Sequence, residues 1–115
     1  MLIAKRIPLA FYRTPLGNEP VKEWLQSLSK TDKKIIGKDL LKIEMGFPIG
    51  LPVCRSLGRG LWECRSDLTH RRIARVIFCI ADARLVALHG FMKKTQKTPH
   101  PEIDCALKRK KEAGL

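Results

Sequence analysis

A strand-like segment in the second half of the chain carries an arginine among apolar neighbours. Arg75 lies within Ile73–Ala81, where most other residues are apolar. A rigid strand holds the planar guanidinium where two of its N–H groups can contact one phosphate. The structural alternative is that Arg75 pairs with Glu63 or Asp67 and closes the edge of a sheet. Arg75 is therefore the first candidate for binding and stabilising a phosphate.

Further cations lie on neighbouring predicted strands. Arg65 follows Glu63 by two residues, so the two side chains share one strand face. We expect Arg65 either to contact phosphate or to pair with Glu63. Lys93 and Lys94 end the last predicted strand, and their side chains point to opposite faces. Either lysine can contact phosphate, but with a pKa of ~10.4 each is a poor base unless burial and nearby cations lower that value. The alternative is that the lysines form a solvated cluster.

His89 is the one histidine within a predicted strand, and it shares a face with Phe91 and Lys93. An unperturbed pKa of ~6.5 suits an imidazole to acid or base work near neutral pH. The alternative is that His89 is a packed core residue. His89 is therefore a candidate for proton transfer.

The charge of the whole chain favours a polyanionic partner. Its 115 residues include 23 Lys and Arg against 11 Asp and Glu, a formal net charge of +12. Residues 51–115 contribute +8 of this charge and residues 1–50 contribute +4. RNA, DNA and an acidic protein would all be attracted, although solubility alone is the alternative explanation. A chain of this length fits a single domain over residues 1–115.

The cysteine pattern argues against a zinc site. Cys54, Cys64, Cys79 and Cys105 form no C-x-x-C pair, so we expect small buried residues in a reducing compartment, with no metal and no cofactor. The N-terminal segment has charges inside its apolar stretch, and no apolar run reaches the ~18 residues of a membrane span. A cytoplasmic protein with neither signal peptide nor membrane segment is expected.

The first half of the chain predicts one strand and two helices. Alternation of Ile7, Leu9 and Phe11 indicates the strand, and Pro8 places it at a sheet edge or at the strand start. Asn18 is the expected cap of the first helix. That helix has apolar residues at helical spacing: Val21, Trp24, Leu25 and Leu28. A second helix follows the caps Ser29 and Thr31 and ends near Gly46 and Pro48, which makes a helical hairpin.

The second half of the chain predicts strands and a last helix. Glycines and prolines between residues 46 and 60 indicate a looped connection. Three strands are expected at Leu61–Ser66, Ile73–Ala81 and Leu85–Met92, and the short turns between them favour antiparallel pairing. Glu102–Glu112 predicts a helix. The fold class is α+β, with an N-terminal strand and a helical hairpin packed on an antiparallel sheet, and a C-terminal helix.

Several segments together resemble a known family. They are Phe11-Tyr12-Arg13-Thr14-Pro15, Leu57-Gly58-Arg59-Gly60-Leu61-Trp62-Glu63-Cys64-Arg65, Arg72-Ile73-Ala74-Arg75-Val76, and Leu88-His89-Gly90-Phe91-Met92-Lys93-Lys94-Thr95-Gln96-Lys97-Thr98-Pro99. The series resembles the phage-derived Gp49-like proteins, a branch of the RelE/ParE toxin superfamily that includes HigB-type toxins. The resemblance extends from about residue 7 to 112, and the His89–Pro99 run is its most specific part.

The resemblance implies a RelE-like fold and a toxin of a toxin–antitoxin system. It implies a metal-independent endoribonuclease that cuts mRNA, in many relatives on the ribosome, and a cognate antitoxin that is commonly a helix-turn-helix protein. Arg75 matches the position of a catalytic arginine in RelE-type toxins, and Arg65 matches a recurring arginine. Glu63 stands near a point where such nucleases tend to carry a lysine, which puts lysine-based proton abstraction there in doubt.

Cleavage by the ribose 2′-hydroxyl requires a base, cations around the phosphate and an acid for the leaving 5′ oxygen. The candidates for catalysis are Arg65, Arg75, His89, Lys93 and Lys94. Arg72 and Lys97 are the candidates for binding RNA. Two alternatives remain, namely a ParE-like toxin that poisons gyrase and a non-enzymatic, basic nucleic-acid-binding prophage protein whose binding weakens with salt.

Overall fold

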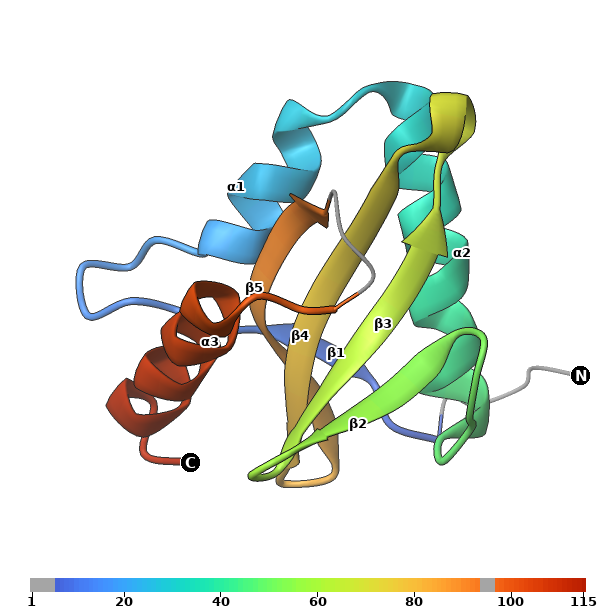
Figure 1. Ribbon diagram of the computed structural model, residues 1–115. Coiled ribbons are helices and arrows are strands. Elements are labelled where there is room, and N and C mark those ends of the chain that lie inside the picture. The colour runs from blue at the N-terminus through green and yellow to red at the C-terminus, as the bar shows by residue number, and fades with distance from the viewer. Residues whose placement is uncertain (1–5, 94–96) are drawn as a thin grey trace, which may run out of the picture.

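Helices cover both faces of a five-stranded sheet in the computed structural model, which describes residues 6–93 and 97–115. In chain order the elements are β1 (Leu9–Phe11), α1 (Pro20–Ser27), α2 (Lys30–Gly46), β2 (Cys54–Gly58), β3 (Leu61–Asp67), a 3₁₀ turn (Thr69–Arg71), β4 (Ile73–Ala81), β5 (Arg84–Lys93) and α3 (His100–Glu112). The α+β class and the order of strand, helical hairpin, strands and final helix are as predicted. Figure 1 shows this order from the N-terminus in blue to the C-terminus in red.

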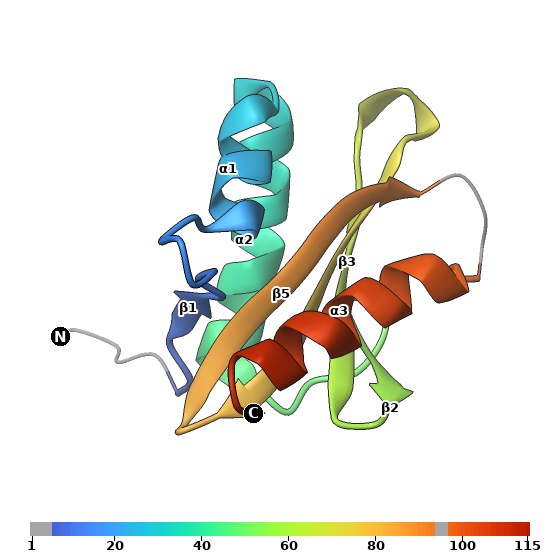
Figure 2. The ribbon, with the colours of Figure 1, turned by 90° about the vertical axis from the view of Figure 1, so that its left-hand side faces the viewer.

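The helical hairpin and the C-terminal helix lie on opposite faces of the sheet (Figure 2). The core on the hairpin side joins α1 and α2 to strand residues such as Cys64, Val76 and Phe78. The core on the other side joins α3 to residues such as Leu61 and Ile77. Strand side chains alternate between these two cores, as the pleat of a sheet requires. A residue of the central strands therefore faces either the hairpin or α3.

The sheet is mixed, which corrects the prediction that it is antiparallel throughout. Its strand order is β1-β5-β4-β3-β2, and β1 pairs with β5 in parallel. The remaining pairs are antiparallel. Short connections join β2, β3, β4 and β5 in succession, and such connections favour antiparallel pairing. β1 is separated from these strands by the helical hairpin, and a connection of that length allows parallel pairing. The edge position that Pro8 predicts for the first strand is confirmed, and that strand is shorter than expected, at Leu9–Phe11.

A strand occurs where the sequence predicts a loop. β2 pairs with β3 in an antiparallel hairpin, with Arg55 opposite Glu63. The turn between them has positive φ at Gly58, Arg59 and Gly60. Two of these three residues are glycines, which adopt that conformation without steric cost. β2 is only five residues long, and the many glycines and prolines around it lead the sequence pattern to predict a loop instead.

The two helices begin close to their predicted positions. Ser29 caps α2, and its hydroxyl accepts a hydrogen bond from the backbone N–H of Asp32. The residue before α1 is Glu19 rather than the expected cap Asn18. Asn18 instead exchanges hydrogen bonds with Thr14 in the preceding turn. No helix in the described ranges is long and apolar enough to cross a membrane.

An irregularity in β5 decides which residues face α3. Pairing between β4 and β5 shifts after Ile77, so that Leu88 is an extra residue between Ala87 and His89. A bulge of this kind reverses the alternation of side chains along the strand. Leu85 and Ala87 pack on the hairpin side, and simple alternation would send His89 there too. Because of the bulge, the His89 imidazole lies against α3.

Candidate functional site

Cations from three adjacent strands lie together on the α3 face of the sheet. Arg65 of β3 is directly opposite Arg75 of β4. Lys93 of β5 pairs with Ile73, two residues before Arg75 on the same face. The backbone of each strand is fixed by its neighbours, so these side chains start from a rigid base. We call Arg65, Arg75, Lys93 and the Glu63 among them the cationic cluster.

Glu63 is the anion at the centre of the cationic cluster, and its side chain is completely buried. Its Oε1 accepts a hydrogen bond of 3.0 Å from Arg65 and lies 3.9 Å from Nε of Arg75. Its Oε2 accepts a hydrogen bond of 2.6 Å from the hydroxyl of Thr98. A buried carboxylate needs such partners because desolvation of its charge is costly. The structural pairing considered for Arg65 and Arg75 is thus present, and both arginines, which the β3–β4 register places opposite each other, share the same carboxylate.

Arg75 has donor capacity that the described residues do not use. Its side chain is only 3% exposed, and one terminal nitrogen donates to the carbonyl of Ala74. Its Nε–H is buried and makes no hydrogen bond within the described part of the chain. Burial, followed by repulsion from Arg65, lowers the pKa of the guanidinium from its ordinary value. A second anion beside Glu63 would relieve both the repulsion and the unmet hydrogen bond.

Lys93 is nearly buried, with 5% of its surface exposed. Burial is the largest cause that lowers the pKa of its ammonium group, and the charge of Arg75 is the next. These are the two conditions under which a lysine gains a neutral fraction that accepts protons. Among the predicted site residues, Lys93 thus combines proximity to cations with the pKa direction that a base requires.

Arg72 is engaged outside the cationic cluster. Its guanidinium makes a bidentate pair with Asp32 of α2, at 2.7 and 2.8 Å. This pair joins the connection before β4 to the start of the helical hairpin, and the hydrogen bonds from Arg72 lower the pKa of Asp32. Arg72 also lines a hollow together with Lys93. The structure therefore gives Arg72 a clear role in holding the layers together.

Of the two remaining predicted lysines, only Lys97 lies within the described residues. Lys94 falls outside the described residues. Lys97 lines a small hollow together with Arg55, Thr98 and other residues of β2 and α3. Because Thr98 contacts Glu63, this hollow adjoins the cationic cluster. The structure thus places Lys97 beside the cluster, on the side of β2.

His89 is held by α3. Its Nε2 lies 2.6 Å from a carboxylate oxygen of Glu102. Its ring stacks on Phe91 with centroids 5.4 Å apart, as expected for two residues on one strand face. Its Nδ1 lies 3.3 Å from a terminal nitrogen of Arg109. Both ring nitrogens therefore have partners on α3, so proton transfer by His89 would require one of these contacts to open.

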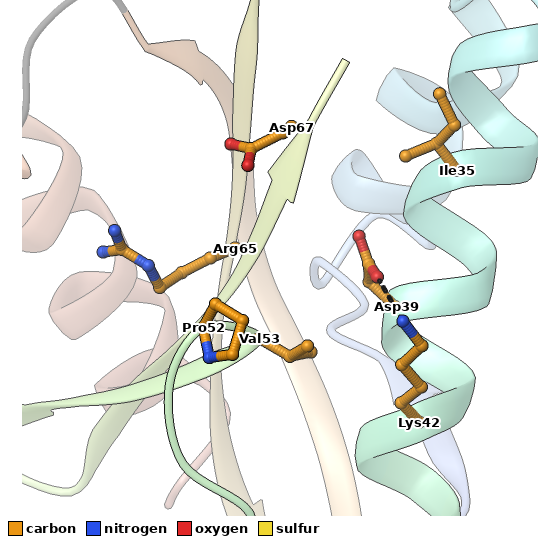
Figure 3. A pocket seen from close by; sticks show the side chains of 7 residues that line it. All are labelled: Ile35, Asp39, Lys42, Pro52, Val53, Arg65 and Asp67. Carbon is orange, nitrogen blue, oxygen red and sulfur yellow. Dashed lines mark ion pairs between the residues drawn. The ribbon is translucent and has the colours of Figure 1, made fainter.

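A hollow beside Arg65, between β3 and α2, has a mixed charge (Figure 3). It lies between α2 and β3 and is lined by Asp67, Asp39 and Lys42, the last two joined in an ion pair of 3.5 Å. Figure 3 shows the Arg65 guanidinium pointing away from α2. Two carboxylates disfavour a polyanion there. The side of β3 toward which the Arg65 guanidinium turns is the better phosphate surface.

The sequence alone does not single out Thr98 or Arg55. Thr98 lies within the specific His89–Pro99 run, which was the available signal, but threonine carries no charge that suggests a role. Arg55 lies in the region predicted as a loop, yet it is opposite Glu63 in the sheet, and its charge contributes to lowering the pKa of Lys93. Pairing of β2 with β3 brings Arg55 to the cluster, and the segment before α3 brings Thr98 to it.

The comparisons with known proteins identify one family. Residues 23–111 match the family model described as phage derived protein Gp49-like (DUF891), which covers most of the chain and includes the whole cationic cluster. No individually curated protein matches the chain. Within the described residues, no group of three or more His, Cys, Asp or Glu side chains is placed to hold a metal ion.

Proposed function

The chain belongs to the Gp49-like family of phage-derived proteins, and from this premise we propose that it is an endoribonuclease toxin that cuts mRNA without a metal ion. The observation that carries the proposal is the convergence of Arg65, Arg75 and Lys93 on one sheet face. Cleavage begins when a ribose 2′-hydroxyl attacks the adjacent phosphate, and charge then builds on the phosphoryl oxygens. Fixed cations stabilise that charge most effectively where water is excluded.

The arginines have different parts in this reaction. Arg65 has 21% of its side chain exposed and would contact an incoming phosphate first. Arg75 lies deeper. When the phosphate reaches its buried guanidinium, the Nε–H that makes no hydrogen bond among the described residues is available to donate to a phosphoryl oxygen. A planar guanidinium also fixes the orientation of the phosphate, which a point charge does less well.

Glu63 acts as an internal counter-ion in this proposal. It holds the two arginines close together before RNA binds, and it limits their mutual repulsion. A phosphate that enters the cluster competes with Glu63 for the same N–H groups. Only an anion with a larger charge or more acceptor oxygens than a carboxylate gains from that exchange, and a phosphate in the transition state has both.

Lys93 is the group that we assign to proton transfer from the 2′-hydroxyl. Its lowered pKa provides a neutral amine at a smaller energetic cost than for an exposed lysine. The positive charge that it gains on accepting the proton would then lie near the developing phosphoryl charge. Lys93 would thus serve in two ways, as an acceptor of the proton and as a stabilising cation.

The partners follow from the family and the charge. The substrate would be mRNA, engaged on the ribosome, and the toxin would be neutralised in the cytoplasm by a cognate antitoxin of the helix-turn-helix type. The net charge of +12 favours rapid encounter with RNA and with an acidic protein surface. The basic last turn of α3, which includes Arg109, Lys110 and Lys111, would contribute to either contact.

The test is expression of the wild type and its variants, followed by mapping of RNA 5′ ends. We expect new 5′ ends in messages with the wild type and a loss of about 10²- to 10³-fold in cleavage for Arg75→Ala or Arg65→Ala, the cost typical of removing one electrostatic stabiliser. Lys34→Ala is the matched control, because it removes one positive charge from the exposed surface of α2. It should cleave like the wild type.

Each rival function predicts a different result. Growth arrest with intact messages and altered DNA topology would replace the ribonuclease by a gyrase poison. Salt-sensitive RNA binding without new 5′ ends would indicate a non-enzymatic binding protein. Equal cleavage by wild type and a folded Arg75→Ala variant would refute the role assigned to Arg75.

A further inference from the structure

Three of the four cysteines lie on strands of the sheet and are buried. Cys54, Cys64 and Cys79 are each 1% exposed. Burial raises the pKa of Cys54 to about 11 and that of Cys64 to about 12, and it also raises the pKa of Cys79. A thiol that stays protonated and out of reach of solvent does not react. These three cysteines fit the expected role of small buried residues.

Cys105 differs from the other cysteines, which corrects the expectation that all four are buried. It lies on α3 at intermediate exposure. Its Sγ lies 3.7 Å from Nδ1 of His89, within the range of a hydrogen bond to sulfur. The other ring nitrogen of His89 lies 2.6 Å from the carboxylate of Glu102. The order thiol, imidazole, carboxylate is the arrangement that activates a cysteine nucleophile.

The geometry around His89 keeps this arrangement in place. Stacking on Phe91 fixes the plane of the imidazole ring. Glu102 and Cys105 lie three residues apart on α3, so one helical face presents both groups to His89. The bulge at Leu88 is what places the imidazole on this side of the sheet. None of these contacts involves the cationic cluster.

Arg109 adds a positive charge next to the thiol. It follows Cys105 by one helical turn, and its terminal nitrogen lies 3.3 Å from the same His89 Nδ1 that Cys105 approaches. The same nitrogen donates 2.8 Å to the carbonyl of Leu88, which anchors the guanidinium. A cation at this position attracts an incoming anionic reagent toward the thiol. Partial exposure and an electropositive setting are the two properties that distinguish reactive cysteines from structural ones.

We propose that Cys105 is a reactive thiol that forms mixed disulfides with low-molecular-weight disulfides. The Cys105 proton passes to Nδ1 of His89 once the contact of that nitrogen with Arg109 opens, and Glu102 balances the imidazolium charge. The Sγ thiolate attacks one sulfur of the incoming disulfide, a new S–S bond forms, and the other half leaves as a thiolate with the electron pair of the broken bond. Cys105 is oxidised and the departing thiol is reduced, so the disulfide itself is the oxidant.

The experiment follows the reaction of the reduced, full-length chain with 5,5′-dithiobis(2-nitrobenzoate), recorded as release of the coloured thiolate. We expect one thiol to react in the native chain and the other three to react only after denaturation. Mass mapping should place the first adduct on Cys105, and Cys105→Ser should remove the fast phase. The proposal is overturned if Cys105 reacts no faster than the buried cysteines do in the native chain.

Variants of the two partners test the mechanism. His89→Gln should slow the reaction by about threefold to tenfold, because the group that accepts the thiol proton is lost. Glu102→Gln should slow it in the same direction, and Glu102→Asp should restore part of the rate. Asp104→Asn is the matched control, since it removes an exposed carboxylate of α3, whereas the carboxylate that contacts His89 belongs to Glu102. An unchanged rate in folded His89→Gln and Glu102→Gln chains would refute activation by these residues, whether or not the chain cuts RNA.

Discussion

Replacing Glu63 with Gln removes a buried charge while preserving the size of the side chain. The amide can still accept the hydrogen bond from Thr98, but the ion pairs at 3.0 Å to Arg65 and 3.9 Å to Arg75 are lost. Breaking a buried ion pair from one side typically costs ~3–5 kcal/mol, because the partner charge is left uncompensated. Arg65 is partly exposed to water, whereas Arg75 is almost completely buried. We therefore expect a loss near the lower end of that range, about 3 kcal/mol.

The assay is urea-induced unfolding followed by tryptophan fluorescence, with the dependence on denaturant compared between variants. Glu23→Gln is the matched control, because it removes an exposed carboxylate on α1, and it should change the stability by no more than ~0.5 kcal/mol. Combining Glu63→Gln with Arg75→Gln should cost less than the sum of the two single changes, since the second change removes the stranded charge. A loss below ~1 kcal/mol for Glu63→Gln would refute the central place given to this carboxylate.

Three further predictions concern other parts of the structure. Gly90→Ala should lower the free energy of unfolding by ~1–3 kcal/mol, because its Cβ would lie 2.4 Å from the ring of Trp24; a thermal melt with no shift would contradict this. Asp32 has a lowered pKa in the folded chain through its hydrogen bonds from Arg72, so it stabilises the fold above its unfolded pKa of ~3.9, and this stabilisation is lost as pH falls through the folded value. The acid limb of a pH–stability curve should accordingly flatten in Asp32→Asn, and an unchanged limb would speak against the pair. Cleavage of RNA should rise with pH through the lowered pKa of Lys93, and a Lys93→Arg variant with the same rising profile would show that another group accepts the proton.

Local patterns in the sequence were sufficient to predict most of the helices and strands. Helical spacing of apolar residues and the cap at Ser29 located the hairpin, and strand boundaries for β3 to β5 differ from the predictions by a residue or less at each end. These features depend on neighbours within a few positions in the chain. Local patterns do not predict the parallel pairing of β1 with β5, because that pairing depends on the path of the chain through the intervening hairpin.

The cationic cluster could be predicted in composition but not in structure. Arg65, Arg75 and Lys93 were recognisable as cations on neighbouring strands. Their common face depends on the register of β3, β4 and β5 and on the bulge at Leu88, which the sequence does not reveal. The partners of Glu63 and the engagement of Arg72 with Asp32 are also contacts between distant segments. Such contacts arise only when the layers pack together.

The contact between Cys105 and His89 shows the same limit. The two lie sixteen positions apart in the chain, and they meet because α3 folds back across β5. Cysteine spacing argued against a zinc site but gave no sign of a thiol beside an imidazole. The distinction between Cys105 and the buried cysteines rests on exposure, which follows from the packing of α3.

The chemistry of the RNA ends tests the proposed ribonuclease most directly. Purified protein would be incubated with a message on translating ribosomes and with the same RNA alone, and the new ends would be analysed. Attack by the 2′-hydroxyl predicts fragments with a 2′,3′-cyclic phosphate and a 5′-hydroxyl, which must be phosphorylated before it can be ligated, and these fragments should be strongly reduced with Arg75→Ala. RNA that stays intact in both settings, or fragments that carry a 5′-phosphate, would contradict the proposed reaction.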